Sequence, residues 1–220
     1  AEKVSGSVSG VAGLMNQKAA ALGCTGTHFV NPNGLNDSNH YTTPYDMALI
    51  ARAVFQNDTL RKIDTTLSYK FPATKNAGER TITMGHKMMY STDSRYYPGI
   101  IGGKTGYTSK AGNTLVTGAE KNGVRLIAVV MKSKSTHYAD TKALLDYGFA
   151  KMAAGGNSGS QNNSQSTNIQ GPGNSSDIAQ PAAPAQKKGW NQDNTGWYYI
   201  KDDNTCLLYT SPSPRDPKTS

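Results

Sequence analysis

Apolar residues near the start of the chain recur at the spacing of a helix. Those that share one helical face are Val8, Val11, Met15, Ala19 and Leu22. Steps of three and four residues bring side chains to one side of a helix, and Gly23 follows where a helix commonly ends. The pattern predicts a helix over residues 7–22.

A second helix is predicted from the signals at its start. Thr43 is a suitable N-cap, Pro44 fits the first helical position, and Asp46 completes a capping box. Its buried face is expected to hold Met47, Ile50, Ala51, Val54 and Phe55. Before it, residues 27–35 are expected to be extended and to end in an Asn-Pro-Asn-Gly turn. Residues 60–85 alternate only weakly, which is typical of strands or loops with little core.

The strongest β pattern runs from Gly99 to Met131. A first strand leads into Gly102–Gly106, and a second is expected near residues 113–120. An Asn-Gly turn follows, and residues 124–131 are almost continuously apolar, as in a strand covered on both faces.

A last helix is predicted over residues 137–152. Its stripe consists of Tyr138, Thr141, Leu145, Phe149 and Met152. Helices, an antiparallel meander and a terminal helix, in that order, predict an α+β fold in which helices flank an antiparallel sheet.

The composition changes after residue 152, and the changes divide the chain into four parts. The predicted folded part covers residues 1–152, and a flexible low-complexity linker covers residues 153–188. Residues 189–205 contain Gly-Trp twice and are expected to be part of a β-hairpin repeat. Residues 206–220 begin CLLYTSPSPRD, which matches the translation of a common sequencing adapter, and are interpreted as an artefact.

The charge and cysteine content exclude several classes of protein. The net charge is +8, and residues 1–151 hold 18 Lys and Arg against 10 Asp and Glu, so they carry the whole excess. These cations are scattered without a nucleic-acid-binding motif, which favours an anionic substrate or polymer instead.

Two cysteines exclude a disulfide scaffold, and no apolar run is long enough for a transmembrane helix. The start Ala1-Glu2-Lys3 is expected of a processed product or an internal fragment.

Lys104, Thr105 and Gly106 are the candidate chemistry on the first predicted strand. An ammonium on a rigid strand attracts an anionic group, and a Thr hydroxyl can bond to it. Glycine lets a ligand approach the backbone N–H groups. Taken alone, the tripeptide favours a plainer interpretation, a solvated lysine beside a turn glycine.

Six segments along residues 1–152 change that interpretation. They are LMNQKA (14–19), THFVNPNGL (27–35), HYTTPYDMALIARA (40–53), IGGKTGYTSKAGNTLV (101–116), RLIAVVM (125–131) and ALLDYGF (143–149). In this order they resemble the serine-type D-alanyl-D-alanine carboxypeptidases, the low-molecular-weight penicillin-binding proteins of the S11 peptidase family. The resemblance implies the transpeptidase fold shared with β-lactamases, here truncated at its N-terminus.

That family uses three motifs, of which only Lys-Thr-Gly has a suitable match. Ser5-Gly6-Ser7 is not Ser-x-Asn, Ser68-Tyr69-Lys70 lacks the spacing of Ser-x-x-Lys, and Ser109-Lys110 follows Lys-Thr-Gly too closely. The resemblance implies a parent enzyme whose Ser attacks the D-Ala-D-Ala bond of peptidoglycan stem peptides and releases D-Ala through an acyl-enzyme. A fragment without that Ser is expected to be inactive.

The resemblance also assigns roles to residues of this chain. Lys104 and Thr105 are expected to bind the terminal carboxylate of the substrate or of a β-lactam, and the Tyr107 N–H to donate in an oxyanion hole. It implies an extracellular, wall-associated protein with a signal peptide upstream.

His137 stands where family members often carry an Arg that anchors the substrate carboxylate. A neutral His would do so weakly. Either Lys132, Lys134 or Arg125 compensates, or carboxylate binding is softer, or His137 is simply an exposed residue at a helix start.

Residues 189–205 resemble one cell-wall-binding repeat of the choline-binding type. In such repeats, aromatic cages hold choline by cation–π contacts, and Trp190, Trp197 and Tyr198 are the candidate wall residues. One repeat cannot close a cage, because neighbouring repeats must stack to bury their faces.

Two alternatives remain open at this point. A class A β-lactamase shares Lys-Thr-Gly but needs a Glu in an E-x-x-L-N loop, and Glu79 is followed by Arg-Thr-Ile-Thr. A non-catalytic wall-binding protein with a degenerate enzyme domain is the other, and the intact Lys-Thr-Gly argues against it. No cofactor is implied, and His28, His40 and His86 are too dispersed in sequence to suggest a metal site.

Overall fold

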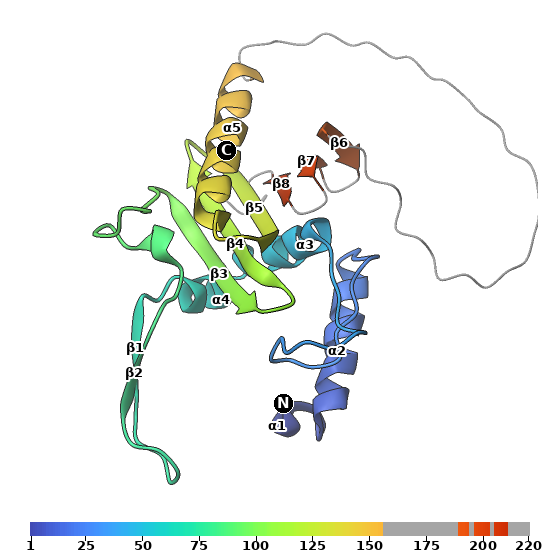
Figure 1. Cartoon of the computed structure of the whole chain (residues 1–220), viewed down its shortest axis with the longest axis vertical. Helices are drawn as coiled ribbons and strands as arrows, with labels where there is room; N and C mark the ends of the chain where they lie inside the picture. Colours follow the sequence, from blue (N-terminus) through green and yellow to red (C-terminus); the bar gives the residue numbers. More distant parts are fainter. Residues whose placement is uncertain (156–188, 194–195, 203–204, 211–220) are drawn as a thin grey trace, which may run out of the picture.

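The computed structural model describes residues 1–155, 189–193, 196–202 and 205–210 (Figure 1). The helices are α1 (Glu2–Ser5), α2 (Val8–Ala21), α3 (Pro44–Phe55), α4 (Asp58–Asp64) and α5 (His137–Gly155), with a 3-10 turn at Lys87–Met89. The strands are β1 (Ser68–Phe71), β2 (Arg80–Thr83), β3 (Ile100–Thr108), β4 (Gly112–Lys121), β5 (Val124–Ser133), β6 (Gly189–Asp193), β7 (Gly196–Asp202) and β8 (Thr205–Thr210). The linker expected over residues 153–188 lies almost entirely outside the described residues.

An antiparallel sheet in the order β3-β4-β5-β8-β7-β6 forms the centre of the fold. Alternate residues of β5 face opposite sides, so both sides of the sheet are covered, as its continuous apolar run predicts. Leu126, Ala128 and Val130 pack with Leu144 and Leu145 of α5. Ile127 and Val129 pack with Leu49 and Phe55 of α3. The predicted α+β class, helices flanking an antiparallel sheet, is confirmed.

The second predicted helix begins as its start signals predict, at Pro44. The Thr43 hydroxyl accepts the N–H of Asp46 at 3.1 Å. Asp46 is only 1% exposed, and its carboxylate binds residues that precede the helix in the sequence. Its Oδ2 accepts the N–H of Gly26 at 2.8 Å and the hydroxyl of Thr27 at 2.6 Å. Asp46 therefore ties α3 to the extended segment before it.

The first predicted helix is present as α2, with Gly23 in the left-handed region (φ 86°) just after it. Its buried residues are Ala12 and Ala19, whereas Val8 is 45% exposed. The stripe thus predicts the helical period correctly but not which residues are covered, because burial depends on the neighbouring elements.

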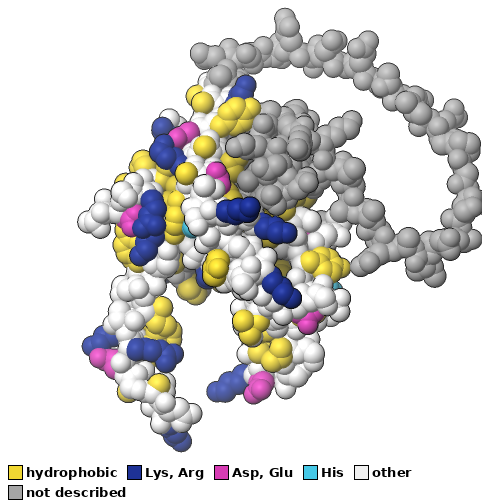
Figure 2. All heavy atoms as spheres, viewed as in Figure 1, with side chains coloured by type: hydrophobic (Ala, Val, Ile, Leu, Met, Phe, Trp, Pro, Cys, Tyr) yellow, Lys and Arg dark blue, Asp and Glu magenta, His cyan; other side chains and the backbone are white. Residues whose placement is uncertain are grey.

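Residues 60–85 contain one element that their weak alternation does not predict. Asn57 caps the seven-residue helix α4 by accepting the N–H of Leu60 at 3.0 Å. Strands β1 and β2 then form a hairpin that projects from the body, and the space-filling view shows a hollow between this hairpin and α2 (Figures 1 and 2). All eight residues of the two strands are exposed, as expected of strands with little core.

Residues 206–220 are interpreted as an artefact, and the first of them, residues 206–210, belong to a strand of the central sheet. Thr205–Thr210 forms β8, which pairs with β5 from Arg125–Thr210 to Val130–Thr205. Strand β5 pairs with β4 along one edge, and the N–H and C=O groups of its other edge pair with β8. Residues 211–220 lie outside the described residues. No helix in the described part of the chain is long and apolar enough to span a bilayer.

Candidate active site

Lys104, Thr105 and Gly106 lie in the middle of β3, the edge strand of the sheet. Pairing with β4 is regular from Gly102 to Thr108, after a bulge between Ile100 and Gly102. Side chains therefore alternate, so that Lys104 shares the α3 side of the sheet with Gly102, and Thr105 shares the α5 side with Gly103.

The open edge of β3 presents backbone donors. The Gly103 N–H points away from β4, because it donates to Asp64 Oδ2 at 2.6 Å. The hydrogen-bonding direction alternates along a strand, so the N–H groups of Thr105 and Tyr107 point the same way. The Lys104 ammonium turns back to this edge and donates to the Thr105 carbonyl at 2.5 Å.

All five residues predicted for catalysis and substrate binding line one cavity of about 720 Å³. They are Lys104, Thr105, Gly106, Tyr107 and His137. Loop residues from the segment before α3, among them Asn33 and His40, form part of the remaining wall. Among the described residues that line the cavity, Lys104 is the single Lys or Arg, so it supplies the permanent positive charge there.

Thr105 is supported from the α5 side of the sheet. A Cβ added to Gly85 would lie 3.1 Å from the Thr105 Oγ1, so glycine leaves room for that hydroxyl. The Tyr138 hydroxyl of α5 donates to the Gly85 carbonyl and accepts the N–H of Lys87, each at 3.2 Å. The start of α5 therefore fixes the segment against which Thr105 rests.

His86 lies behind the strand at Gly103. Its side chain is fully buried, and its Nε2 is 2.7 Å from the Thr117 Oγ1 of β4. A Cβ on Gly103 would come within 2.5 Å of the imidazole Cδ2, so only glycine fits at this position. Burial lowers the pKa of His86 to about 4, which keeps the ring neutral at neutral pH.

His137 is half-buried at the start of α5, and its Nδ1 has no hydrogen-bond partner within the described structure. Burial, followed by the charge of Arg95, lowers its pKa, while Asp140 acts in the opposite direction. His137 is therefore neutral at neutral pH. Lys132, Lys134 and Arg125 are not among the described lining residues, and Arg125 pairs with Glu120 at 2.6 Å.

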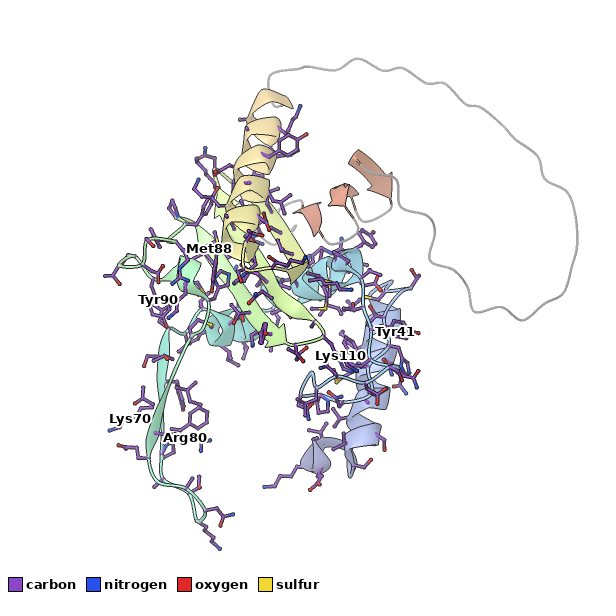
Figure 3. All side chains as sticks on the ribbon, in the orientation of Figure 1. Tyr41, Lys70, Arg80, Met88, Tyr90 and Lys110 are labelled. Atoms are coloured by element: carbon purple, nitrogen blue, oxygen red, sulfur yellow. The ribbon has the colours of Figure 1, made fainter. Side chains whose placement is uncertain are left out.

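The other candidate residues lie elsewhere. Glu79 pairs with Lys70 at 2.9 Å on the projecting hairpin and does not line the cavity. Figure 3 shows Lys70 and Arg80 halfway along this hairpin, with Tyr90 at its base. Trp190 lies on β6 opposite Tyr199, and Trp197 and Tyr198 lie on β7, but their side chains fall outside what the structure describes.

Three residues that position the site strand and its neighbouring segment, Asp64, His86 and Tyr138, are not predicted by any local pattern in the sequence. The Gly102-Gly103 pair was the available signal, because glycines inside a strand often mark a close approach by another group. In the part of the chain that the structure describes, no group of three His, Cys, Asp or Glu could hold a metal ion.

A family model described as D-alanyl-D-alanine carboxypeptidase, peptidase S11, matches residues 1–135. The chain belongs to this family. It is 33% identical over 153 residues to the D-alanyl-D-alanine carboxypeptidase DacF of Bacillus subtilis, and 36% identical over 143 residues to DacB2 of Mycobacterium tuberculosis. These matches cover 69% and 62% of this chain, but only 38% and 47% of the relatives, so the chain spans less than half of their length.

Solved structures show the same fold. A D-alanyl-D-alanine carboxypeptidase from Mycobacterium tuberculosis H37Rv superimposes with a TM-score of 0.61 at 33% identity, over 68% of this chain and 56% of that one. The Streptomyces K15 DD-transpeptidase gives 0.58 at 31% identity, over 64% and 54%. The S11 chain therefore has the DD-peptidase fold over its first part.

Proposed function

We propose that residues 1–152 are part of a serine-type D-alanyl-D-alanine carboxypeptidase and that their cavity binds the terminal carboxylate of a peptidoglycan stem peptide. One observation carries this proposal. Lys104 is the single permanent cation among the described lining residues, and the Thr105 hydroxyl and the outward N–H groups of β3 lie beside it. An ammonium with neighbouring donors is the chemistry that recognises a carboxylate.

The roles proposed for the site residues come from the family resemblance and agree with the positions of these residues on β3. Lys104 Nζ and Thr105 Oγ1 bind the carboxylate of the terminal D-Ala. Gly106 carries no side chain, which lets the substrate lie against the strand. The Tyr107 N–H donates to the carbonyl oxygen of the scissile bond as negative charge develops there. A neutral His137 adds a hydrogen bond but no charge, so the carboxylate depends mainly on Lys104.

The longer protein would complete the reaction with a Ser that residues 1–152 do not place in a Ser-x-x-Lys motif. That Ser attacks the carbonyl carbon of the penultimate D-Ala, the C–N bond breaks, and D-Ala leaves with the proton on its nitrogen. Water then hydrolyses the ester. A β-lactam, whose carboxylate and carbonyl are arranged like those of the substrate, enters the same site.

The proposal extends to location and partners. A peptidoglycan substrate implies an extracellular, wall-associated protein with a signal peptide upstream. Trp190, Trp197 and Tyr198 are proposed to belong to a choline-type repeat that binds a wall polymer once neighbouring repeats stack on it. No cofactor is required, because acyl transfer through Ser uses none.

Penicillin labelling tests the proposed reaction. The protein encoded by the complete reading frame should form a covalent adduct with a fluorescent penicillin and release D-Ala from a peptide ending in D-Ala-D-Ala. The 220-residue chain should form no adduct under the same conditions. Labelling of the isolated chain, or a complete protein with intact motifs that neither labels nor releases D-Ala, would contradict the proposal.

A further inference from the structure

Asp64 binds an outward N–H of the candidate site strand. It is the last residue of α4, and its Oδ2 accepts the Gly103 N–H at 2.6 Å, one residue before Lys104. The next outward donors along this edge are the N–H groups of Thr105 and Tyr107. A carboxylate of the protein thus binds the same row of donors that the substrate is proposed to use.

The same carboxylate lies on the Lys104 side of the sheet. Gly102 and Lys104 share that side, and a Cβ on Gly102 would collide with Asp64 Oδ2 and come within 2.7 Å of the Phe55 ring. Lys104 is also close enough to act on Asp64. Burial raises the pKa of the Asp64 carboxyl, while the bond from Gly103 and the charge of Lys104 oppose that rise.

Neither burial nor helix position favours a carboxylate at residue 64. A negative charge at a helix C-terminus is unfavourable, because the backbone dipoles already place negative charge there. Desolvation adds a second cost. The Gly103 N–H and the nearby Lys104 offset part of these costs, so the contact with β3 favours a carboxylate at this position.

His86 contacts the same strand from the α5 side of the sheet. Its ring lies against Gly103, and its Nε2 is held at 2.7 Å from the Thr117 Oγ1. Gly103 therefore cannot move toward α5, while the Asp64 bond restrains it at the open edge. The backbone that carries Lys104 is fixed from both faces of the sheet.

We propose that Asp64 is a positioning residue for carboxylate recognition: it fixes the backbone that presents Lys104, Thr105 and Tyr107, and its charge behind Lys104 moderates the affinity of the strand for the substrate carboxylate. This inference rests on the proposed function of the same cavity. The hydrogen bond from Gly103 to Asp64 should raise the affinity for the substrate carboxylate, whereas the negative charge of Asp64 should lower it. Two substitutions separate the bond from the charge. Asp64→Ala removes both, whereas Asp64→Asn keeps an acceptor for the Gly103 N–H and removes only the charge.

The first measurement needs no ligand. Amide hydrogen exchange is followed by NMR in the 220-residue chain and in the variants Asp64→Ala, Asp64→Asn and Asp58→Asn. Asp58 is the matched control, because it is an exposed acid on the same helix that pairs with Arg61. Asp64→Ala should raise exchange at Gly103 about tenfold, whereas the other two variants should stay within about twofold of the parent chain. An unchanged Gly103, or a rise that extends equally to the β5 amides, would overturn the positioning role.

The second measurement titrates the same four proteins with N-acetyl-L-Lys-D-Ala-D-Ala. Asp64→Ala should weaken binding about fivefold. Asp64→Asn should tighten it about two- to threefold, because a repulsive charge near the bound carboxylate is gone. Equal affinity of both variants and the parent chain would overturn the inference. Failure of the parent chain to bind the peptide would instead contradict the proposed function, while amide exchange still decides the positioning role. If Asp64→Ala does not fold, the affinity of Asp64→Asn decides.

Discussion

His86 is neutral in the folded protein because burial removes the water that would solvate its charge. Its pKa is lowered from 6.5 to about 4, so between these pH values only the unfolded chain binds the proton. Stability is therefore fully present above about pH 6.5 and is lost as the pH falls toward 4. The loss is on the order of 3 kcal/mol from a shift of this size, and the lowered pKa of His137 adds to it in the same direction.

Urea unfolding between pH 4 and pH 7 measures this loss. In His86→Asn the free energy of unfolding should depend much less on pH over this window, because a non-titrating side chain replaces the imidazole. His28→Asn is the matched control. His28 lies in the segment before α3, away from His86, where its backbone forms a bridge with Tyr41. The same pH slope in His86→Asn and the parent chain would show that another group controls stability in this range.

At the scale of residues, the sequence predicts groups that form a local motif and misses those that depend on long-range contacts. Lys104, Thr105 and Gly106 are consecutive, so their chemistry can be read directly. Asp64 bonds to a residue 39 positions away, and His86 to one 31 positions away. Only the packing of α4 and of the segment at His86 against the sheet brings these side chains to the strand.

Helix α3 is positioned by one buried carboxylate as well as by its apolar face. Asp46→Ala would leave the Gly26 N–H and the Thr27 hydroxyl without their acceptor. Because removing one partner of a buried pair costs the desolvation of the other, we expect a loss of about 2 to 4 kcal/mol in the free energy of unfolding. Thr43→Ala removes only the N-cap and should cost about 1 kcal/mol. Chemical denaturation compares the two, and equal losses would contradict the cross-linking role of Asp46.

At the scale of elements, the periodicity of apolar residues predicts the long helices and strands that have a buried face. The predicted helices and strands of the core appear as α2, α3, β3, β4, β5 and α5, within a few residues at each end. Helix α4 has only seven residues, and its Leu60 and Ile63 are 44% and 64% exposed, so no buried stripe marks it. Strand β8 depends on pairing with the edge of β5, a contact between segments about 80 residues apart that no local pattern contains.

At the scale of the whole molecule, the central sheet supports the candidate site on its edge strand. One side of β5 packs on α5 and the other on α3, and the elements that hold Gly103 come from both of these layers. The resulting cavity takes its permanent charge from Lys104. Lys and Arg side chains elsewhere are spread over the visible face rather than gathered in one patch (Figure 2). Lys104 on β3 is therefore the proposed anchor for a substrate carboxylate.

Titration of the 220-residue chain with two forms of one peptide tests this claim most directly. N-acetyl-L-Lys-D-Ala-D-Ala is compared with its C-terminal carboxamide, and the backbone amides of residues 104–107 are followed by NMR. The carboxylate form should shift these amides and bind at least about tenfold more tightly, since a charge-assisted hydrogen bond contributes about 1.5 to 3 kcal/mol. Lys104→Ala should remove the difference, whereas Lys121→Ala, at the far end of β4, should leave it. Equal binding of both peptide forms, or amide shifts that bypass β3, would contradict the account.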